Sequence, residues 1–245
     1  MAAPARPAVL QVERIDTLRG PAHILRAVSL SVAADEAVCL VGRNGAGKTT
    51  TIESIMGLLP VRAGRVTLGE RDITRLPAYA RARLGIGYAP EDAGIFPDLT
   101  VTENFEISHW LAGSSTGAGR APGDVYERTY ALFPEIRQFL GRRGLFLSGG
   151  QKKMVAIARA LMLSPSILLL DEPFEGLAPV VVSRFIDAVK SIKAMGVSLL
   201  IAESNLANAV RVADRLYAID RGEIIFEGPP RSALDNEEVM KTLRG

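Results

Sequence analysis

Gly42-Arg43-Asn44-Gly45-Ala46-Gly47-Lys48-Thr49 is the stretch of sequence that decides the fold, because it matches the pattern G-x-x-x-x-G-K-[ST] without interruption. An apolar run at 37–41 precedes it, and a segment with helical spacing, 48–56, follows, which predicts a strand, a glycine-rich turn and a helix. In such a turn the backbone N–H groups point inward around phosphate oxygens, and the helix N-terminus adds positive potential. The stretch therefore predicts a phosphate-binding loop in an α/β domain.

The side chains of this loop indicate a nucleotide, ATP, bound with Mg²⁺. Lys48 provides a positive charge for the phosphates, and the Thr49 hydroxyl is placed to bind a Mg²⁺ ion that bridges two of them. A glycine-rich turn without a ligand is the alternative, but the lysine, the threonine and the strand–helix context are all present. The expected nucleotide-binding residues of the loop are Gly42, Arg43, Asn44, Gly45, Ala46, Gly47, Lys48, Thr49 and Thr50.

Two adjacent acids, Asp171 and Glu172, follow a run of buried-strand character at 167–170. Carboxylates at the C-terminal end of a strand face the crevice where α/β sheets bind ligands. Asp171 is the expected partner of Mg²⁺, directly or through water, and Glu172 is expected to polarise the water that attacks the γ-phosphate. The alternative is that both acids only end a strand and begin a loop.

A third motif, Leu147-Ser148-Gly149-Gly150-Gln151, stands at the start of a predicted helix. Its serine and glycines would leave N–H groups free at a helix N-terminus, which predicts a second anion site. Taken alone, the motif is equally compatible with a helix N-cap. One domain would then carry two phosphate-facing surfaces, which is expected if ATP lies between two copies or partners.

Composition limits the remaining possibilities. The 245 residues include 29 Lys+Arg and 27 Asp+Glu, are 48% hydrophobic and contain one cysteine, which excludes a disordered chain and a disulfide scaffold. The net charge of +2 includes no basic tract, so nucleic acid is not an expected partner. No window approaches about 18 uninterrupted apolar residues, so the chain is not expected to span a membrane.

Short apolar runs alternate with segments of helical spacing, as in an α/β domain. Alternating polarity at 10–15, 28–32 and 65–68 predicts antiparallel strands that form a mixed β edge, and the region 101–139 predicts a helical insertion with a flexible link at 112–123. The expected core strands are 37–41, 86–89, 166–170, 198–202 and 215–219. The expected helices are 48–56, 126–133, 151–163, 180–195, 205–212 and 237–243.

The order of these motifs resembles the ATP-binding subunits of ABC transporters. The resemblance implies one ABC ATPase domain over 1–245. Its P-loop NTPase core, at 1–91 and 160–245, would contain a mixed β-sheet that is parallel with an antiparallel edge. An α-helical subdomain would be inserted at 92–159. It makes 147–151 the signature that contacts the ATP of a partner, and it makes Glu172 catalytic.

The stretches 88–92, 95–104 and 172–182 resemble the smaller ATPase of bacterial and archaeal branched-chain amino acid importers, whose relatives also serve urea and short amides. This resemblance implies a dimer with a different sister ATPase, two membrane permeases and, indirectly, a periplasmic or extracytoplasmic solute-binding protein. The chain would lie peripherally at the cytoplasmic face of the inner membrane. Trp110 is interpreted as core or, alternatively, as part of the surface that docks on a permease.

Four residues depart from the common ABC pattern. Glu91 replaces the glutamine that senses Mg²⁺ but keeps an oxygen ligand, and Ala178 replaces an aspartate. Ser204 stands at the switch-histidine position, where a hydroxyl lacks the reach and the charge of an imidazole. Arg19 replaces the aromatic that stacks on adenine, and a guanidinium can also stack on a base.

Three functions follow from these observations. The first is an ATPase that powers transport through permeases. The second is a DNA-repair or translation ATPase of the same class, which would need long heptad coiled coils or two fused cassettes, and neither is present. The third is a degenerate subunit that binds nucleotide while its sister ATPase performs most of the hydrolysis, which Ser204, Ala178 and Arg19 would favour.

Overall fold

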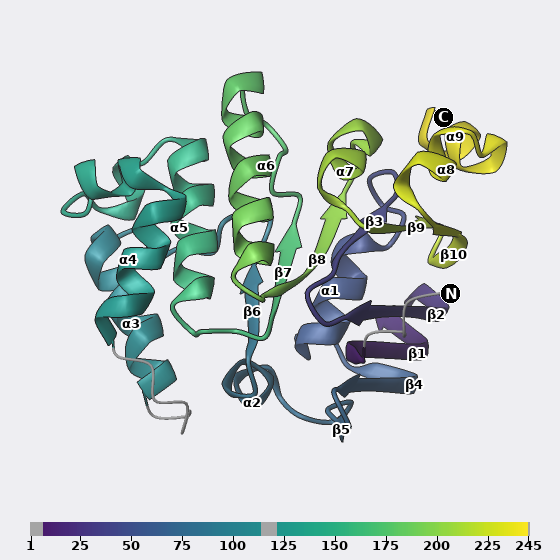
Figure 1. Ribbon diagram of the computed structural model, residues 1–245. Coiled ribbons are helices and arrows are strands. Elements are labelled where there is room, and N and C mark those ends of the chain that lie inside the picture. The colour runs from purple at the N-terminus through teal and green to yellow at the C-terminus, as the bar shows by residue number, and fades with distance from the viewer. Residues whose placement is uncertain (1–6, 114–121, 245) are drawn as a thin grey trace.

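The computed structural model describes residues 7–113 and 122–244 of the chain (Figure 1). Its larger sheet has six strands in the order β10-β9-β3-β8-β7-β6. Neighbouring strands pair in parallel except β9 and β10, which are antiparallel. The strands are β3 (Ala37–Val41), β6 (Ile86–Ala89), β7 (Ile167–Asp171), β8 (Ser198–Glu203), β9 (Arg215–Asp220) and β10 (Glu223–Gly228).

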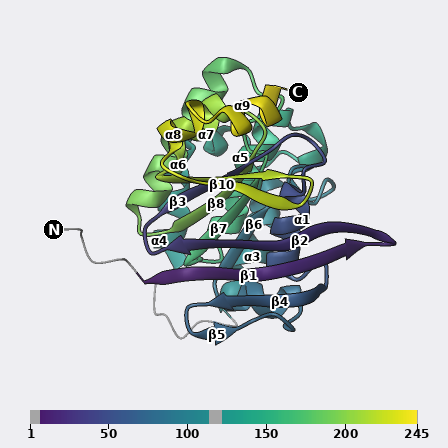
Figure 2. The same ribbon diagram turned by 90° about the vertical axis from the view of Figure 1, so that its right-hand side faces the viewer.

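A second sheet has four antiparallel strands in the order β2-β1-β4-β5. Figure 2 shows these strands one below another, with β2 nearest to β10 of the larger sheet. Buried and exposed residues largely alternate along β1, so one face of this sheet packs on the core. Its strands are β1 (Ala8–Arg19), β2 (Ala22–Ala33), β4 (Val61–Leu68) and β5 (Arg71–Asp72).

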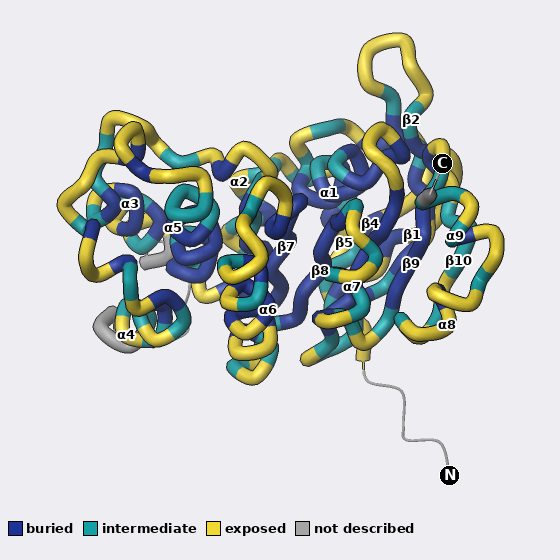
Figure 3. The backbone as a smooth tube through the Cα atoms, turned by 90° about the horizontal axis from the view of Figure 1, so that it is seen from above, coloured by how far each residue is buried: buried dark blue, intermediate teal, exposed yellow. Residues whose placement is uncertain are grey.

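Helices cover both faces of the larger sheet. Strand β7 shows why: Leu168 and Leu170 pack into the cluster that holds α5 and α6, whereas Ile167 and Leu169 pack into the cluster that holds α1 and the second sheet. Figure 3 shows β7 and β8 in dark blue, buried between outer helices that have exposed faces. The helices are α1 (Lys48–Met56), α2 (Ala78–Arg83), α3 (Val101–Gly113), α4 (Pro122–Leu132), α5 (Gly149–Leu161), α6 (Pro179–Ala194), α7 (Leu206–Val212), α8 (Pro230–Leu234) and α9 (Glu237–Arg244), with 3-10 turns at Pro134–Gln138 and Gly144–Phe146.

The predicted fold class is confirmed: the domain is α/β with parallel and antiparallel strands. The predicted strands 37–41 and 86–89 and the helix 48–56 have the observed bounds. The N-terminal strands, however, form a sheet of their own, and the antiparallel edge of the larger sheet is β10. Strand β10 was not predicted, because its partly buried residues do not alternate with exposed ones.

Other expectations meet the structure in different ways. Trp110 is 77% exposed, so its interpretation as core is wrong. Most of the predicted link at 112–123 lies outside the described residues. The division at 91/92 and 159/160 stays a prediction, although α5 continues through position 159. Among the described residues, no helix has the length and apolarity needed to cross a membrane.

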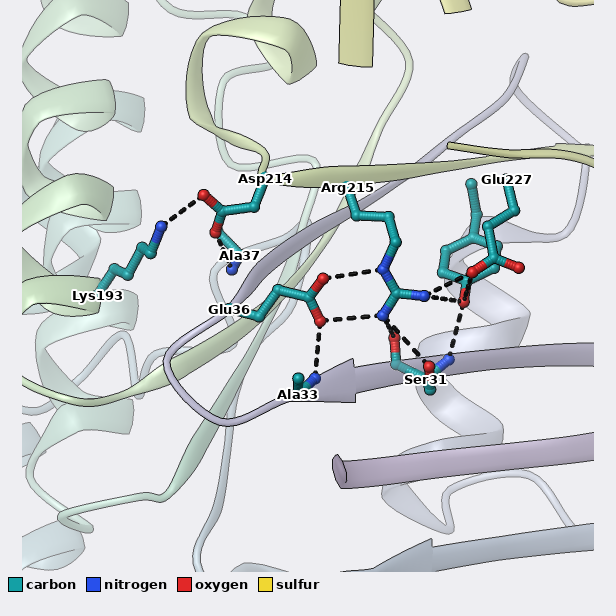
Figure 4. Close-up of polar contacts among 9 residues, drawn as sticks. Ser31, Ala33, Glu36, Ala37, Lys193, Asp214, Arg215 and Glu227 are labelled. Atoms are coloured by element: carbon teal, nitrogen blue, oxygen red, sulfur yellow. Dashed lines mark hydrogen bonds and ion pairs between the residues drawn. The ribbon is translucent and has the colours of Figure 1, made fainter. Parts of the chain in front are cut away.

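Arg215 on β9 joins the two sheets (Figure 4). Its guanidinium donates two parallel hydrogen bonds to Glu36, at 2.8 and 2.9 Å, and another to Glu227 of β10 at 2.6 Å. It also donates to the carbonyl of Ser31 on β2 at 2.9 Å and to the hydroxyl of Tyr217 at 2.6 Å. A planar five-donor group suits this junction because its donors together reach acceptors on β2, on β10 and in the turn before β3.

Replacing this guanidinium is expected to lower stability. Arg215→Met leaves the partly buried Glu36 without its cation, so the free energy of unfolding should fall by about 2–3 kcal/mol. The matched control is Arg65→Met, which removes an ion pair with Asp72 whose side chains are both more than half exposed, and it should cost less than about 0.5 kcal/mol. Urea denaturation of both variants measures the difference, and equal effects would contradict the assignment.

Candidate active site

The loop between β3 and α1 is built to accept an anion. Helix α1 starts after Gly47, whose φ of 115° is a conformation that side-chain-bearing residues rarely adopt, and a Cβ there would lie 2.9 Å from Leu25 Cδ2. No side chain among the described residues caps this helix, so its first N–H groups are not taken by a capping side chain. The donor set fits phosphate oxygens.

Lys48 connects this loop to the acids after β7. Its side chain is 5% exposed, and Nζ donates to the carbonyl oxygens of Gly42 at 2.8 Å and Arg43 at 3.2 Å. The same nitrogen lies 3.0 Å from Oε1 of Glu172, and both side chains are buried. The predicted loop lysine and the predicted catalytic acid are therefore in direct contact.

Thr49 and Asp171 form the part of the site that fits Mg²⁺. The Thr49 hydroxyl donates to Asp171 Oδ1 at 3.2 Å, and Asp171 is 2% exposed. Its Oδ2 has no hydrogen-bond partner among the described residues. Burial raises the pKa of Asp171 to about 6, although the hydrogen bond from Thr49 acts in the opposite direction. A cation bound nearby would lower this pKa again. A hydroxyl beside an unpartnered carboxylate oxygen suits a hard cation.

Mg²⁺ would depend on few protein ligands here. Among the described residues, no group of three or more His, Cys, Asp and Glu side chains is placed to hold a metal ion. Thr49 and Asp171 would hold it together with phosphate oxygens, as this ion prefers. When bound, the ion neutralises charge that develops on the phosphates.

Glu172 is held by hydrogen bonds at one carboxylate oxygen and at its main chain. Its Oε2 accepts hydrogen bonds from the backbone N–H of Ser204 at 3.0 Å and from the Ser204 hydroxyl at 3.1 Å. Its own N–H donates to the carbonyl of Ala202 at 3.0 Å, and its φ is 45°, a left-handed conformation that is strained for a residue with a side chain. Such strain is typical of functional sites, where the surroundings impose one conformation.

Two adjoining clefts lie beside these residues. A cleft of about 440 Å³ is lined by Arg19, Glu172 and loop residues, so Arg19 and part of the loop lie at the same cleft. The loop residues that line it are Asn44, Gly45, Gly47, Lys48, Thr49 and Thr50. Arg19 pairs there with Glu53 of α1. A second cleft of about 480 Å³ contains Asp171 and Thr49.

Glu91 lines both clefts together with Thr49. The side chain of Glu91 is exposed, but partial desolvation by its neighbours raises its pKa, and the negative charges of Glu175 and Glu172 add to this effect. Its position beside the Thr49–Asp171 pair is compatible with the predicted metal ligand, and that role stays a prediction. Of the remaining loop residues, Ala46 is buried in the core rather than facing the cleft.

The motif at 147–151 lies apart from this site. Ser148 caps α5: its hydroxyl accepts from the N–H of Gln151 at 3.3 Å, and the Gln151 side chain accepts from the Ser148 N–H at 3.0 Å. Leu147 is buried, whereas Ser148 and Gly149 are exposed. None of these described residues lines either cleft. The helix-cap interpretation is therefore correct, and a contact with the ATP of a partner stays a prediction.

Several residues of the site were not predicted. Glu175 is four residues from Asp171 and lines both clefts, a position that the loop after the acidic strand could have indicated. Ile24 lines the first cleft and Glu53 lines the second. Lys153 lines the second cleft, and Glu203 is buried at the end of β8. The positions of these residues in the site depend on which strands are neighbours in the sheet. A local sequence pattern does not predict the strand order.

Comparison with known proteins agrees with this geometry. A family model described as ABC transporter matches residues 25–175. The lipopolysaccharide export system ATP-binding protein LptB of Escherichia coli strain K12 is 36% identical over 225 residues, 91% of each chain. A probable ABC transporter ATP-binding protein of Azorhizobium caulinodans is 38% identical over 228 residues, 92% of this chain and 79% of the other. The structure of MJ1267, an ATP-binding cassette of an ABC transporter, has a TM-score of 0.81 at 30% identity, covering 97% of this chain and 99% of that one.

A phosphate-binding loop and an acidic strand end, both after parallel strands of one sheet, define a P-loop nucleoside triphosphatase. The chain belongs to the ABC transporter family, as an ATP-binding subunit. It is an ATPase that uses ATP with Mg²⁺ to power transport. ABC ATPases work as dimers with membrane permease partners.

Glu203 gives the site a measurable pH dependence. It is 1% exposed, its Oε1 accepts from the Asn205 N–H at 2.8 Å, and its Oε2 has no hydrogen-bond partner among the described residues. Burial raises its pKa to about 7, and the charge of Glu172 adds to this. The folded state therefore binds more protons than the unfolded state between the ordinary pKa and about 7, and its stability falls as pH rises through this window.

Glu203→Gln is expected to remove the loss of folding stability that the deprotonation of Glu203 causes as the pH rises. Between about pH 5 and about pH 8, the wild-type chain should lose about 2–3 kcal/mol more unfolding free energy than the variant. Glu223→Gln, which removes an exposed carboxylate on β10, is the matched control. Urea denaturation at both pH values measures the effect, and parallel pH profiles for wild type and Glu203→Gln would refute it.

Proposed function

We propose that Glu172 is the catalytic carboxylate of this ATPase, and that the chain energises the uptake of small polar solutes through two partner permeases. The observation that carries the catalytic proposal is the position of Glu172 between Lys48 and Ser204, beside the Thr49–Asp171 pair. A carboxylate at this position can accept a proton from the attacking water.

The contacts of Glu172 suggest how the nucleotide activates it. Phosphate oxygens entering the loop attract the Lys48 ammonium, which at present lies 3.0 Å from Glu172 Oε1. Releasing Oε1 from Lys48 would leave it free to orient water for in-line attack, while Ser204 keeps Oε2 in place through two hydrogen bonds. Lys48 then stabilises the charge on the phosphates.

A second polypeptide completes the site in this proposal. The exposed Ser148 and Gly149 begin α5 away from both clefts, so they would contact the phosphates of a partner's ATP. The partner is a second ATPase, and we infer a different sister chain from the resemblance of 95–104 and 172–182 to branched-chain amino acid importers. Two permeases and a solute-binding protein outside the membrane complete the assembly, with this chain at the cytoplasmic face.

The alternative of a degenerate, nucleotide-holding subunit rests on Ser204, Ala178 and Arg19. The contacts of Ser204 argue against it. Both its N–H and its hydroxyl bond to Glu172, so the residue at the switch-histidine position still positions the acid. The contacts of Lys48 with Glu172 and of Thr49 with Asp171 also support an active site in this chain.

The cargo proposed here is a branched-chain amino acid, with urea and short amides as related solutes. Its support is the resemblance at 88–92, 95–104 and 172–182. A second function, export of lipopolysaccharide, is favoured by a different observation, the 36% identity over 91% of the chain with LptB of Escherichia coli. The two functions differ in direction and in partners, so they can be separated in cells.

Glu172→Gln tests the catalytic proposal. Turnover of ATP by the assembled complex should fall by about a hundredfold or more, because the amide cannot accept the proton, while ATP still binds. Ser204→Ala keeps the backbone hydrogen bond to Glu172 and should lower turnover by less than about tenfold. Steady-state hydrolysis and nucleotide binding measure both effects, and near-normal turnover with Glu172→Gln would place catalysis in the partner's site.

Lys48→Ala in living cells tests the transport proposal. Cells of the organism that encodes this chain should lose uptake of radiolabelled leucine, urea or acetamide, to the level of cells without the chain. Lys190→Ala, an exposed substitution on α6, is the control and should retain uptake. Normal uptake of all three solutes with defective lipopolysaccharide transport would favour the second function, and no change in either would contradict both.

A further inference from the structure

Lys153 lies in the second turn of α5 and reaches from this helix to the acidic end of β7. Its Nζ donates a hydrogen bond to the backbone carbonyl of Glu172. The side chain is partly buried and lines the cleft that contains Asp171, Glu91 and Glu175. The mechanism proposed above gives this lysine no role, although it contacts the catalytic residue directly.

The carbonyl that Lys153 binds belongs to a strained residue. Glu172 has a φ of 45°, and the direction of its carboxylate depends on this backbone conformation. On one side the Glu172 N–H donates to the carbonyl of Ala202, and on the other the Glu172 carbonyl accepts from Lys153 and, at 3.3 Å, from the N–H of Glu175. Lys153 therefore links the main chain of Glu172 to helix α5.

The charge around Lys153 explains how an ammonium persists there. Partial burial lowers the pKa of Lys153, and the carboxylates of Glu175, Glu172, Glu203 and Glu91 act in the opposite direction. These acids come from the segments after β6 and β7 and from the end of β8, so the ammonium has negative neighbours on several elements. A neutral side chain of the same length would remove this positive charge and leave Lys48 as the cation in contact with Glu172.

We propose that Lys153 is a positioning residue for ATP hydrolysis, which fixes the main chain of Glu172 so that its carboxylate faces the attacking water. The inference rests on the proposal that Glu172 is the catalytic carboxylate. Because Lys153 follows 147–151 on the same helix, it also makes the position of Glu172 depend on the position of α5. Contact of that helix with a partner's nucleotide would thereby reach the acid of this chain's own site.

Lys153→Met is the first test, in the assembled complex with ATP. The kcat should fall by about tenfold, because misplacement of a catalytic group by a fraction of an ångström has effects of this size, while KM for ATP changes by less than about twofold. Lys153→Arg keeps a cationic donor and should recover most of the activity. Lys190→Met removes an exposed lysine of α6 and should leave kcat unchanged.

A double-variant cycle separates positioning from a general structural role. If Lys153 acts through Glu172, adding Lys153→Met to Glu172→Gln should cause no further loss of the residual turnover. An additive loss, or a larger effect on KM than on kcat, would overturn the inference. The thermal unfolding midpoint of each variant is measured in parallel. If Lys153→Met fails to fold, Lys153→Gln and Lys153→Arg carry the same comparison.

The outcome also distinguishes the two proposals. If Glu172→Gln retains wild-type turnover, the catalytic role of Glu172 is wrong and the inference on Lys153 falls with it. If Glu172→Gln abolishes turnover and all three Lys153 variants keep wild-type kcat, Glu172 remains catalytic and only the positioning role of Lys153 is refuted.

Discussion

Parallel pairing of β3, β8 and β7 is the constraint on which the rest of the structure depends. In this register Val41 lies opposite Glu203, and Ala202 lies opposite Asp171, so three chain segments leave the sheet at the same edge. The phosphate-binding loop follows the first strand, Glu172 follows the third, and Ser204 follows the strand between them. Contact between Lys48 and Glu172, residues far apart in the sequence, is a direct consequence of this strand order.

The same edge concentrates buried charge at a cost to stability. Burial raises the pKa of Asp171 and of Glu203, and each has an oxygen without a partner among the described residues. Lys48 and Lys153 compensate part of this charge by contacting Glu172 at its side chain and at its main chain. Apolar residues at these positions would pack at lower cost, so the arrangement is better explained by its function than by its contribution to folding.

Local pattern in the sequence is enough for some of this structure and not for the rest. The sequence predicts the phosphate-binding loop from the glycine spacing before Lys48, and it predicts the acidic strand end from the two acids after 167–170. Both predictions are possible because a strand, a turn and a helix are determined by residues that are neighbours in the sequence. Strand β10 and the separate N-terminal sheet depend on which edges pair, and half-buried strands carry little information about that. The hydrogen bonds of Ser204 and Lys153 to Glu172 are likewise nonlocal, since they join three elements that only the strand order brings together.

The helix N-termini that follow the two glycine motifs, those of α1 and α5, do not line the same cleft. Helix α1 faces the cleft, with no capping side chain among the described residues, whereas α5 begins with a complete capping box outside both clefts. A capping box keeps the start of α5 rigid whether or not an anion is near. If the start of α5 contacts a partner's nucleotide, as we propose, a movement of α5 as a whole would reach Glu172 through the hydrogen bond of Lys153. Hydrolysis in one site would then respond to occupancy of the other through a rigid helix and one hydrogen bond.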